Sequence, residues 1–287
     1  MKASFSLPAA RPAAVSSALL ALTLLGVSAP SHAQARADAL PLWELGAVGL
    51  GVSQQAYPGS DQQVQRRLLV PFAVYRGPLL RADRDGIGLR AIRTDRFELD
   101  LSAALAFGAG SDALEARTGM PELGTLVELG PRLKWRLDAT ADSPGRWRVE
   151  VPLRGVYDIS NSFAGRGLSL EPELRYEVRH AGWAYNLSAG LLLGNQRLAS
   201  TFYEVTPWQA TADRPAYASR GGLIATRLGA TASRSLTPQL RALAFVRLDS
   251  VAGAANASSP LVRQTNGLSA GVGFIYVFAR SSQRAAD

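Results

Sequence analysis

The sequence contains no cysteine, only two histidines and no long apolar run beyond residue 35. Without cysteine the chain can form neither disulfide bonds nor cysteinyl metal sites. A helix that crosses a membrane needs about 20 consecutive apolar residues, so no such helix is predicted beyond residue 35. Average hydropathy does not exclude a membrane β-barrel, because a barrel distributes its apolar residues by alternation.

Histidine is too scarce for most catalytic sites. His32 lies in the N-terminal segment described below, which leaves His180 alone in the rest of the chain. A nucleophilic triad or a His-ligated metal is hard to assemble from one histidine. We therefore predict no enzyme and no catalytic, cofactor-binding or metal site, although a site built from carboxylates alone stays open.

Positive charge is in excess but is not clustered. The formal net charge is +8, and the arginines are spread along the whole chain. No recognition-helix pattern accompanies them, so nucleic acid is not an expected partner.

The first 35 residues have the features of an export signal. Lys2 and Arg11 precede an apolar run at 13–27, and small residues then fit an A-x-A-like cleavage site. This order predicts a signal peptide over residues 1–33, cleaved after Ala33 or Ala35. We predict a barrel domain over residues 36–279 and a short tail over residues 280–287.

Most of the remaining chain alternates between apolar and polar residues. In segment 125–138, for example, Leu133 and Trp135 alternate with Arg132 and Lys134. Successive strand side chains point to opposite faces, so each such segment predicts a strand with one apolar and one polar face. We predict twelve strands, at 43–53, 66–76, 78–84, 87–93, 96–108, 123–138, 146–158, 167–179, 183–194, 221–234, 240–250 and 266–278.

These strands fit an all-β fold, a transmembrane antiparallel up-and-down β-barrel. A soluble sandwich would also alternate, but many of the segments are longer than usual soluble strands, and aromatic residues lie near their ends. Connections alternate between short and long, which predicts short periplasmic turns, long outer loops and both termini in the periplasm. The third and fourth strands are short, so ten strands is the alternative. The orientation of 240–250 is ambiguous, since Leu243 and Phe245 share a face with Arg241 and Arg247.

The polar faces would line the lumen with opposite charges. A hairpin that pairs 138 with 146 places Lys134 opposite Glu150, and a pairing of 158 with 167 places Arg154 opposite Glu171. The second register also places Arg148 opposite Glu177 and Glu150 opposite Arg175. Such a lumen is either a structural filling of ion pairs, which we favour, or a small-solute channel. The candidate lumen residues are Glu128, Arg132, Lys134, Arg148, Glu150, Arg154, Glu171, Glu173, Arg175 and Glu177.

The outer loops carry aromatic side chains that have two interpretations. Pro58 and Gly59 predict a turn after the first strand, and 195–219 is the longest loop. Exposed aromatics would anchor a partner, whereas a loop folded over the barrel mouth would form a lid. The candidate contact residues are Tyr57, Asp61, Phe202, Tyr203, Trp208 and Tyr217.

Several short motifs, in order along the mature chain, resemble one family of outer-membrane proteins. They are Trp43-Glu44-Leu45-Gly46, Ala56-Tyr57-Pro58-Gly59-Ser60-Asp61, Arg84-Asp85-Gly86-Ile87-Gly88-Leu89, Thr94-Asp95-Arg96-Phe97, Thr201-Phe202-Tyr203-Glu204-Val205-Thr206-Pro207, Pro215-Ala216-Tyr217, Gly221-Gly222-Leu223, Ser259-Pro260-Leu261-Val262 and Gly267-Leu268-Ser269-Ala270-Gly271-Val272-Gly273. Together they resemble the MltA-interacting protein (MipA)/OmpV family.

This resemblance implies an outer-membrane barrel that contacts lipid and the barrel-insertion machinery. In some members it also implies a scaffold that joins a lytic transglycosylase to a murein synthase, and other members are adhesins or immunogenic surface proteins. Such barrels end on an aromatic residue that the insertion machinery reads. Phe274, Tyr276 and Phe278 alternate as expected, but residues 279–287 extend beyond them.

Overall fold

The computed structural model describes residues 41–76, 80–83, 86–89, 92–94, 96–106, 114–137 and 144–283. The predicted signal peptide lies outside the described residues, as does the second half of the predicted C-terminal tail, 284–287. The last strand extends to Arg280, and Ser281 still donates a backbone hydrogen bond to Trp43. The barrel therefore includes the first residues that we had assigned to the tail.

The fold is all-β and consists of one antiparallel sheet with short helices in the loops. The helices are η2 (Glu115–Arg117), α1 (Gln196–Tyr203) and η3 (Pro207–Gln209). The strands are β1 (Trp43–Gln55), β2 (Gln63–Arg76), β3 (Leu80–Asp83), β4 (Gly86–Leu89), β5 (Ile92–Arg93), β6 (Phe97–Ala106), β7 (Leu126–Leu137), β8 (Gly145–Asp158), β9 (Ala164–Leu170), β10 (Glu173–His180), β11 (Trp183–Gly194), β12 (Gly222–Ser235), β13 (Leu240–Ser250) and β14 (Asn266–Arg280).

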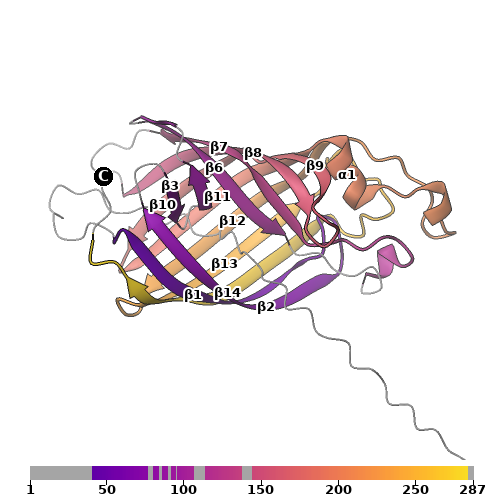
Figure 1. The fold of residues 1–287 in the computed structure, drawn as a ribbon. Helices are drawn as coiled ribbons and strands as arrows, with labels where there is room; N and C mark the ends of the chain where they lie inside the picture. Colours follow the sequence, from indigo (N-terminus) through magenta and orange to yellow (C-terminus); the bar gives the residue numbers. More distant parts are fainter. Residues whose placement is uncertain are drawn as a thin grey trace, which may run out of the picture.

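The sheet curls round on itself into a barrel of tilted strands (Figure 1). Its order runs from β4 through β3, β2 and β1 to β14, and then down to β6 and β5. The two ends of this order meet, since β4 lies against β6. Strands β9 and β10 both pair with β8 and with β11, so they form one interrupted strand.

The twelve predicted strands are all found in their predicted order. Nine of them are uninterrupted and at least ten residues long, and β9–β10 makes a tenth. Within the predicted third strand the structure describes the four residues of β3, and within the fourth it describes β4 and β5. The residues that flank them at 77–79, 84–85 and 90–91 lie outside the described part of the chain. These short strands pair with β2 and β6 at only a few positions. The described part of the barrel is therefore least regularly paired between β2 and β6.

The two ends of the barrel differ in their connections. Both ends of the described chain lie at the end with short turns, and the long loops with α1 lie at the opposite end (Figure 1). At the short end, Ala181 and Gly182 both have positive φ, which suits a two-residue hairpin turn. The connection between the strands predicted at 146–158 and 167–179 is shorter than expected. Strand β9 already begins at Ala164, because Ser162 and Phe163 adopt left-handed conformations that close a tight turn.

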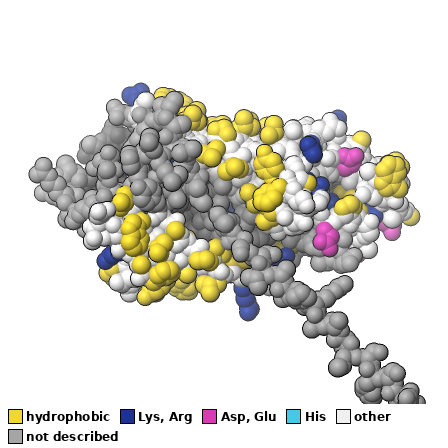
Figure 2. Space-filling view, in the orientation of Figure 1, with side chains coloured by type: hydrophobic (Ala, Val, Ile, Leu, Met, Phe, Trp, Pro, Cys, Tyr) yellow, Lys and Arg dark blue, Asp and Glu magenta, His cyan; other side chains and the backbone are white. Residues whose placement is uncertain are grey.

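Alternation along each strand separates the two faces of the wall. On β7, Leu133 and Trp135 point outward and are each more than 40% exposed, whereas Arg132 and Lys134 point inward and are 4% exposed. Hydrophobic side chains accordingly spread over the visible outer wall (Figure 2). The folded chain thus exposes apolar groups and encloses charged ones. Among the described residues, no helix is both long and apolar enough to cross a membrane.

One sector of the interior is apolar instead of charged. Leu243 and Phe245 face inward with Arg247, which resolves the ambiguous orientation of β13. Glycines on the terminal strands make room for rings in this sector: a Cβ on Gly271 would lie 2.3 Å from the Phe245 ring. The sector is formed by Val48, Leu50, Val52, Leu243 and Ile275, with Leu68, Phe72 and Phe245 packed against them.

Candidate functional site: the charged lumen and its loop cap

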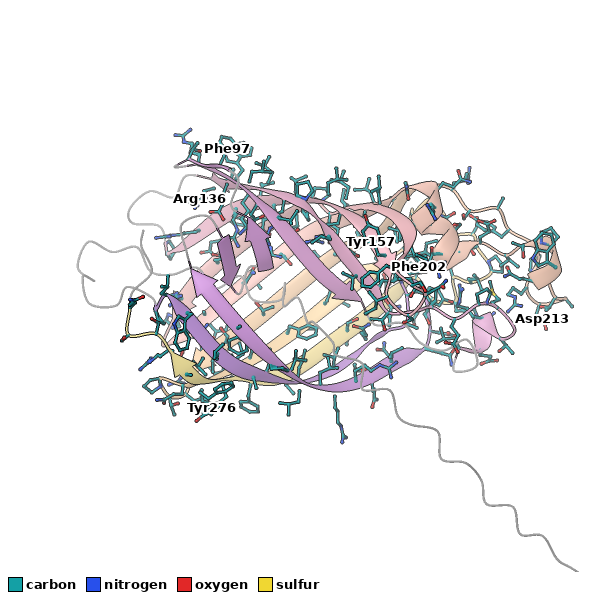
Figure 3. All side chains as sticks on the ribbon, in the orientation of Figure 1. Phe97, Arg136, Tyr157, Phe202, Asp213 and Tyr276 are labelled. Carbon is teal, nitrogen blue, oxygen red and sulfur yellow. The ribbon has the colours of Figure 1, made fainter. Side chains whose placement is uncertain are left out.

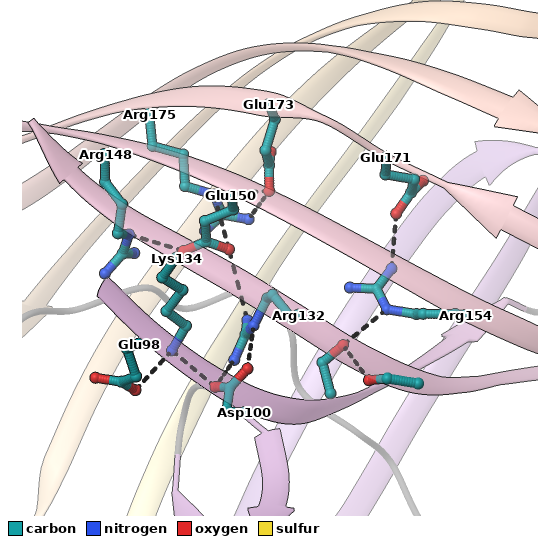
Figure 4. Close-up of polar contacts among 12 residues, drawn as sticks. Glu98, Asp100, Arg132, Lys134, Arg148, Glu150, Arg154, Glu171, Glu173 and Arg175 are labelled. Carbon is teal, nitrogen blue, oxygen red and sulfur yellow. Dashed lines mark hydrogen bonds and ion pairs between the residues drawn. The ribbon is translucent and has the colours of Figure 1, made fainter. Parts of the chain in front are cut away.

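The centre of the charged lumen is Glu150, whose side chain is 2% exposed (Figure 4). Its carboxylate lies 2.7 Å from the Arg148 guanidinium, 3.5 Å from Arg132 and 3.7 Å from Arg175. Lys134 lies directly opposite Glu150 in the backbone register. Alternation on β7, β8 and β10 directs all of these groups inward, and three cations around one carboxylate offset the cost of burying it.

Asp100 on β6 is a second hub of the same network. The Arg132 guanidinium donates to both of its oxygens, at 3.0 and 2.7 Å, and Lys134 lies 3.0 Å away. Glu98 lies 3.5 Å from Lys134 and 3.3 Å from Arg136. Neither acid was among the candidate lumen residues, although both lie on the polar face of an alternating segment and could have been found from it.

A second cluster lies nearer the loops. Arg154 on β8 contacts Glu171 at 2.7 Å and Glu128 at 3.4 Å, and its Nε donates to the Ser102 hydroxyl. Glu171 also pairs with Arg227 on β12. Arg227 and Arg247 in turn share Asp249, at 3.0 and 3.1 Å. The predicted lumen set omitted Arg247 and Asp249, because the ambiguous pattern of β13 hid which face points inward. It also omitted Arg227 on β12.

The first predicted register is confirmed and the second is wrong. Lys134 pairs with Glu150 across β7 and β8 as expected. Across β8 and β10, however, Glu150 pairs with Glu173, and Arg148 pairs with Arg175, a shift of two residues from the prediction. The three predicted ion pairs across these strands still form, because long side chains reach diagonal neighbours on the same face.

The lumen pairs its ions closely. Each cation of the two clusters lies within 4 Å of at least one carboxylate, and most carboxylates serve two or more cations. Among the described residues, no group of three or more histidine and acidic side chains is arranged to hold a metal ion. His180 ends β10 and is exposed at the short-turn end, away from these clusters. The chemistry that this arrangement supports is mutual neutralisation of charge.

The long loops at the other end fold together into a loop cap, formed by residues 56–62, 114–125, 195–221 and 251–265. The Tyr57 hydroxyl donates to Leu261 at 2.7 Å, and the Tyr203 hydroxyl donates to Pro58 at 2.9 Å. Arg117 donates to the Phe202 carbonyl. These contacts join all four segments around a shared hydrophobic core, whose members include Leu114, Leu198, Tyr203, Val205, Val251 and Leu261.

Helix α1 is the cap's main packing element. Asn195 caps its N-terminus by accepting from Leu198 N–H, and also accepts from Leu168 N–H on β9. The helix buries Leu198, Ala199 and Tyr203 against the cap core. Burial raises the pKa of Tyr57 to about 12, although Arg117, whose guanidinium lies 5.9 Å from its ring centre, opposes the shift. Burial also raises the pKa of Tyr203 and lowers the pKa of Arg117.

The predicted contact residues differ in how far the cap buries their side chains. Tyr57 and Tyr203 are 3% and 1% exposed, and Phe202 and Tyr217 pack against the core. Of the two interpretations left open, their packing favours the loop folded over the barrel mouth, because these rings hold the loops to one another. Trp208 is 85% exposed, and Asp61 is half exposed with Arg263 at 3.9 Å. Trp208 is thus the one aromatic of the set left free for a partner.

Aromatic side chains also mark the two ends of the outer wall. Phe274, Tyr276 and Phe278 point outward from β14 and are each more than half exposed. Phe97 and Tyr276 lie toward the short-turn end, and Tyr157 lies toward the cap (Figure 3). This distribution is typical of the aromatic girdles of membrane barrels.

A cavity of about 300 Å³ lies inside the barrel beneath the cap. Tyr57 and Phe202 line it from the cap, and Asn186, Thr231 and Arg247 line it from the wall. The cap and the ion-pair clusters therefore border a small space that is lined by both apolar and polar side chains.

Comparison with protein families identifies one family for this chain. The family described as MltA-interacting protein MipA matches residues 46–278. No curated protein matches the chain significantly.

Three solved structures are similar to the chain in part. The NanC porin shares 9% identity at a TM-score of 0.38, over 80% of this chain and 98% of that chain. The translocator domain of autotransporter NalP from Neisseria meningitidis shares 12% at 0.45, over 85% and 90%. Outer membrane phospholipase A from Escherichia coli shares 12% at 0.34, over 83% and 94%. At such TM-scores none of them carries an inference about what this chain does.

Proposed function

The chain belongs to the MltA-interacting protein MipA family, and from that premise we propose that it is a non-enzymatic outer-membrane scaffold. Its partners would be murein-remodelling enzymes, a lytic transglycosylase and a murein synthase. The family description supports the first of these, because it gives MltA as the interacting protein. The apolar outer wall with aromatic ends supports the membrane location.

The observation that carries the proposal is the filled and capped lumen. Glu150, Asp100 and Glu171 tie five strands together through cations, and Tyr57 and Tyr203 fasten the loops over one mouth. An open channel needs a continuous aqueous path, whereas ion pairs cross this interior and the loop cap covers one mouth. A rigid barrel of this kind serves better as a platform than as a pore.

A periplasmic partner would contact the end opposite the cap. The turns there are short, so the available surface is the turns, the chain ends and the barrel rim. Leu236 in the β12–β13 turn is 53% exposed and supplies an apolar contact at this end. Its counterpart at the cap end is Trp208, which is 85% exposed.

Co-purification from detergent tests the scaffold role and the face that it uses. Purified barrel should capture a lytic transglycosylase above the level of an unrelated barrel. Leu236→Asp should weaken the capture, and Trp208→Ala, a change at an exposed residue of the other end, should leave it unchanged. Capture no better than background would defeat the proposal.

A channel is the second candidate, favoured by the cavity beneath the cap. Planar-bilayer recording of the purified protein separates the two roles. A scaffold with a closed lumen should give no steady unitary currents, and steady currents would favour the channel.

A surface adhesin is the third candidate, favoured by the exposed Trp208. Whole-cell binding by a Trp208→Ser variant tests it without disturbing the buried rings of the cap. Unchanged binding by this variant would count against an adhesive role for the loop.

A further inference from the structure

Strands β11 and β12 give the lumen a third kind of inner wall, neither ionic nor apolar. Asn186 on β11 lies directly opposite Thr231 on β12, and Ser188 lies opposite Gly229. All four residues line the cavity beneath the cap. The register therefore gathers one carboxamide and two hydroxyls on a single uncharged patch, which we call the amide–hydroxyl patch (Asn186, Ser188 and Thr231).

The side chains of this patch are not committed to the protein. Asn186 is 8% exposed, and its carbonyl oxygen accepts no hydrogen bond within the described part of the chain. The hydroxyls of Ser188 and Thr231 likewise make no hydrogen bond with a described residue. Leaving a buried polar group without a partner costs about 1–3 kcal/mol, so the patch favours an occupant that supplies donors and acceptors.

The wall is recessed at the patch. A Cβ on Gly229 would lie 2.6 Å from the Ser188 hydroxyl, so only glycine leaves this space open. Phe245 flanks the patch on β13, and Tyr57 and Phe202 face the cavity from the cap. The volume of about 300 Å³ is at the lower end of ligand pockets and is suited to a molecule the size of a monosaccharide.

The ion pairs around the patch disfavour a charged occupant. Arg227 and Arg247 are held by Asp249, and Arg154 is held by Glu171. A charged molecule would have to compete with these pairs, whereas a neutral one needs only the uncommitted amide and hydroxyls. We propose that this cavity is a binding site for a neutral, hydroxyl-rich molecule of monosaccharide size, covered by the loop cap.

Titration calorimetry on the detergent-solubilised barrel tests the proposal, with D-glucose and N-acetyl-D-glucosamine as probes. At least one should bind with a dissociation constant of about 10 mM or tighter. Glucosamine, a cation, and gluconate, an anion, should bind more weakly, because they meet no free counter-charge. If the wild-type protein binds neither neutral sugar in that range, or prefers a charged one, the proposal is overturned.

Two near-isosteric variants and one control locate the site. Asn186→Leu and Thr231→Val should each weaken binding about tenfold, because they remove hydrogen bonds worth about 1.4 kcal/mol. Ser233→Ala removes a buried hydroxyl from the same strand, outside the cavity lining, and should bind like wild type. Equal binding by all three variants would place the sugar elsewhere. Capture of a murein enzyme is a separate readout, so failure here leaves the scaffold role to its own test.

Discussion

Arg148 and Glu177 form an ion pair of 2.6 Å, although the backbone partner of Arg148 is Arg175, two residues before Glu177. Arg154 and Glu171 repeat this diagonal arrangement: Arg154 pairs in the backbone with Ser169. Because a long side chain can reach a diagonal neighbour as well as a direct one, one charged group can contact side chains on more than one strand. The charged wall is consequently a mesh, in which the loss of one carboxylate weakens the compensation of several cations at once.

Glu150→Gln should be strongly destabilising. Three guanidiniums surround this carboxylate, and removing one partner from a buried ionic group costs about 3–5 kcal/mol. Urea unfolding in lipid vesicles measures the change in the free energy of unfolding. Asp213→Asn, on an exposed loop (Figure 3), is the control and should change it by less than about 0.5 kcal/mol. Similar midpoints for the two variants would show that the mesh is not needed.

Leu133→Arg should lower the free energy of unfolding if the outer wall of the barrel faces lipid. Leu133 points outward from the middle of β7, where an arginine would cost about 2–4 kcal/mol if it faces the bilayer core. The same substitution at Leu236, exposed in a short turn, should cost little. The comparison is made from unfolding free energies in vesicles. An equal, small effect at both positions would mean that the wall faces water.

Gly271→Val should destabilise the barrel by overpacking. Its Cβ would lie 2.3 Å from the Phe245 ring and 2.9 Å from the Gly51 carbonyl oxygen, and such overpacking costs about 1–3 kcal/mol or more. Gly49→Val is the matched control, since a Cβ on Gly49 would meet nothing within 4 Å. Thermal loss of the folded band in unboiled gels gives the comparison. If Gly49→Val is the more harmful variant, the assigned inner and outer faces of β1 and β14 are wrong.

The loop cap should loosen at alkaline pH. The pKa of Tyr57 is raised to about 12 in the fold by burial, against about 10 in an unfolded chain. The neutral phenol thus stabilises the cap fully below pH 10, and this contribution is lost as the pH rises toward 12. Amide hydrogen exchange in residues 196–205, compared with β7, should increase selectively over this range.

Tyr57→Phe is the control for that alkaline transition. It keeps the ring but removes both the titrating group and the bond to Leu261, so the cap should be weaker at neutral pH and less sensitive above pH 10. Tyr203, whose pKa is also raised by burial, should leave a residual alkaline effect. A variant that loosens with the same pH dependence as wild type would show that Tyr57 does not control the cap.

Alternation made the strands and their order predictable from the sequence. Period two in 125–138 or 183–194 sets which side chains face lipid and which face the lumen, and turn residues separate the segments. The ion pairs of Arg148, Arg154 and Glu150 were predictable for the same reason, since all lie on polar faces of adjacent strands. Their register was not, because the diagonal and the direct partner are equally compatible with the alternation.

The cap was not predictable from local patterns. Pro58 and Tyr203 are separated by 145 positions, and only the folded loops bring the Tyr203 hydroxyl to Pro58. Aromatic residues in a long loop look the same in the sequence whether they bind a partner or one another. The apolar sector of the lumen was missed for a related reason, since Leu243 and Phe245 share one face of β13 with charged residues and alternate with apolar ones, so the pattern does not orient the strand.

The two-sided wall is tested most directly by single cysteines, which the cysteine-free chain allows at any position. Spin labels placed one at a time from Tyr185 to Leu191 on β11 in proteoliposomes report their access to oxygen in lipid and to a water-soluble nickel chelate. Labels at Tyr185, Leu187, Ala189 and Leu191 should be accessible from lipid, and labels at Asn186, Ser188 and Gly190 should not. Uniform access from water along the whole strand, with no alternation, would contradict a lipid-facing barrel.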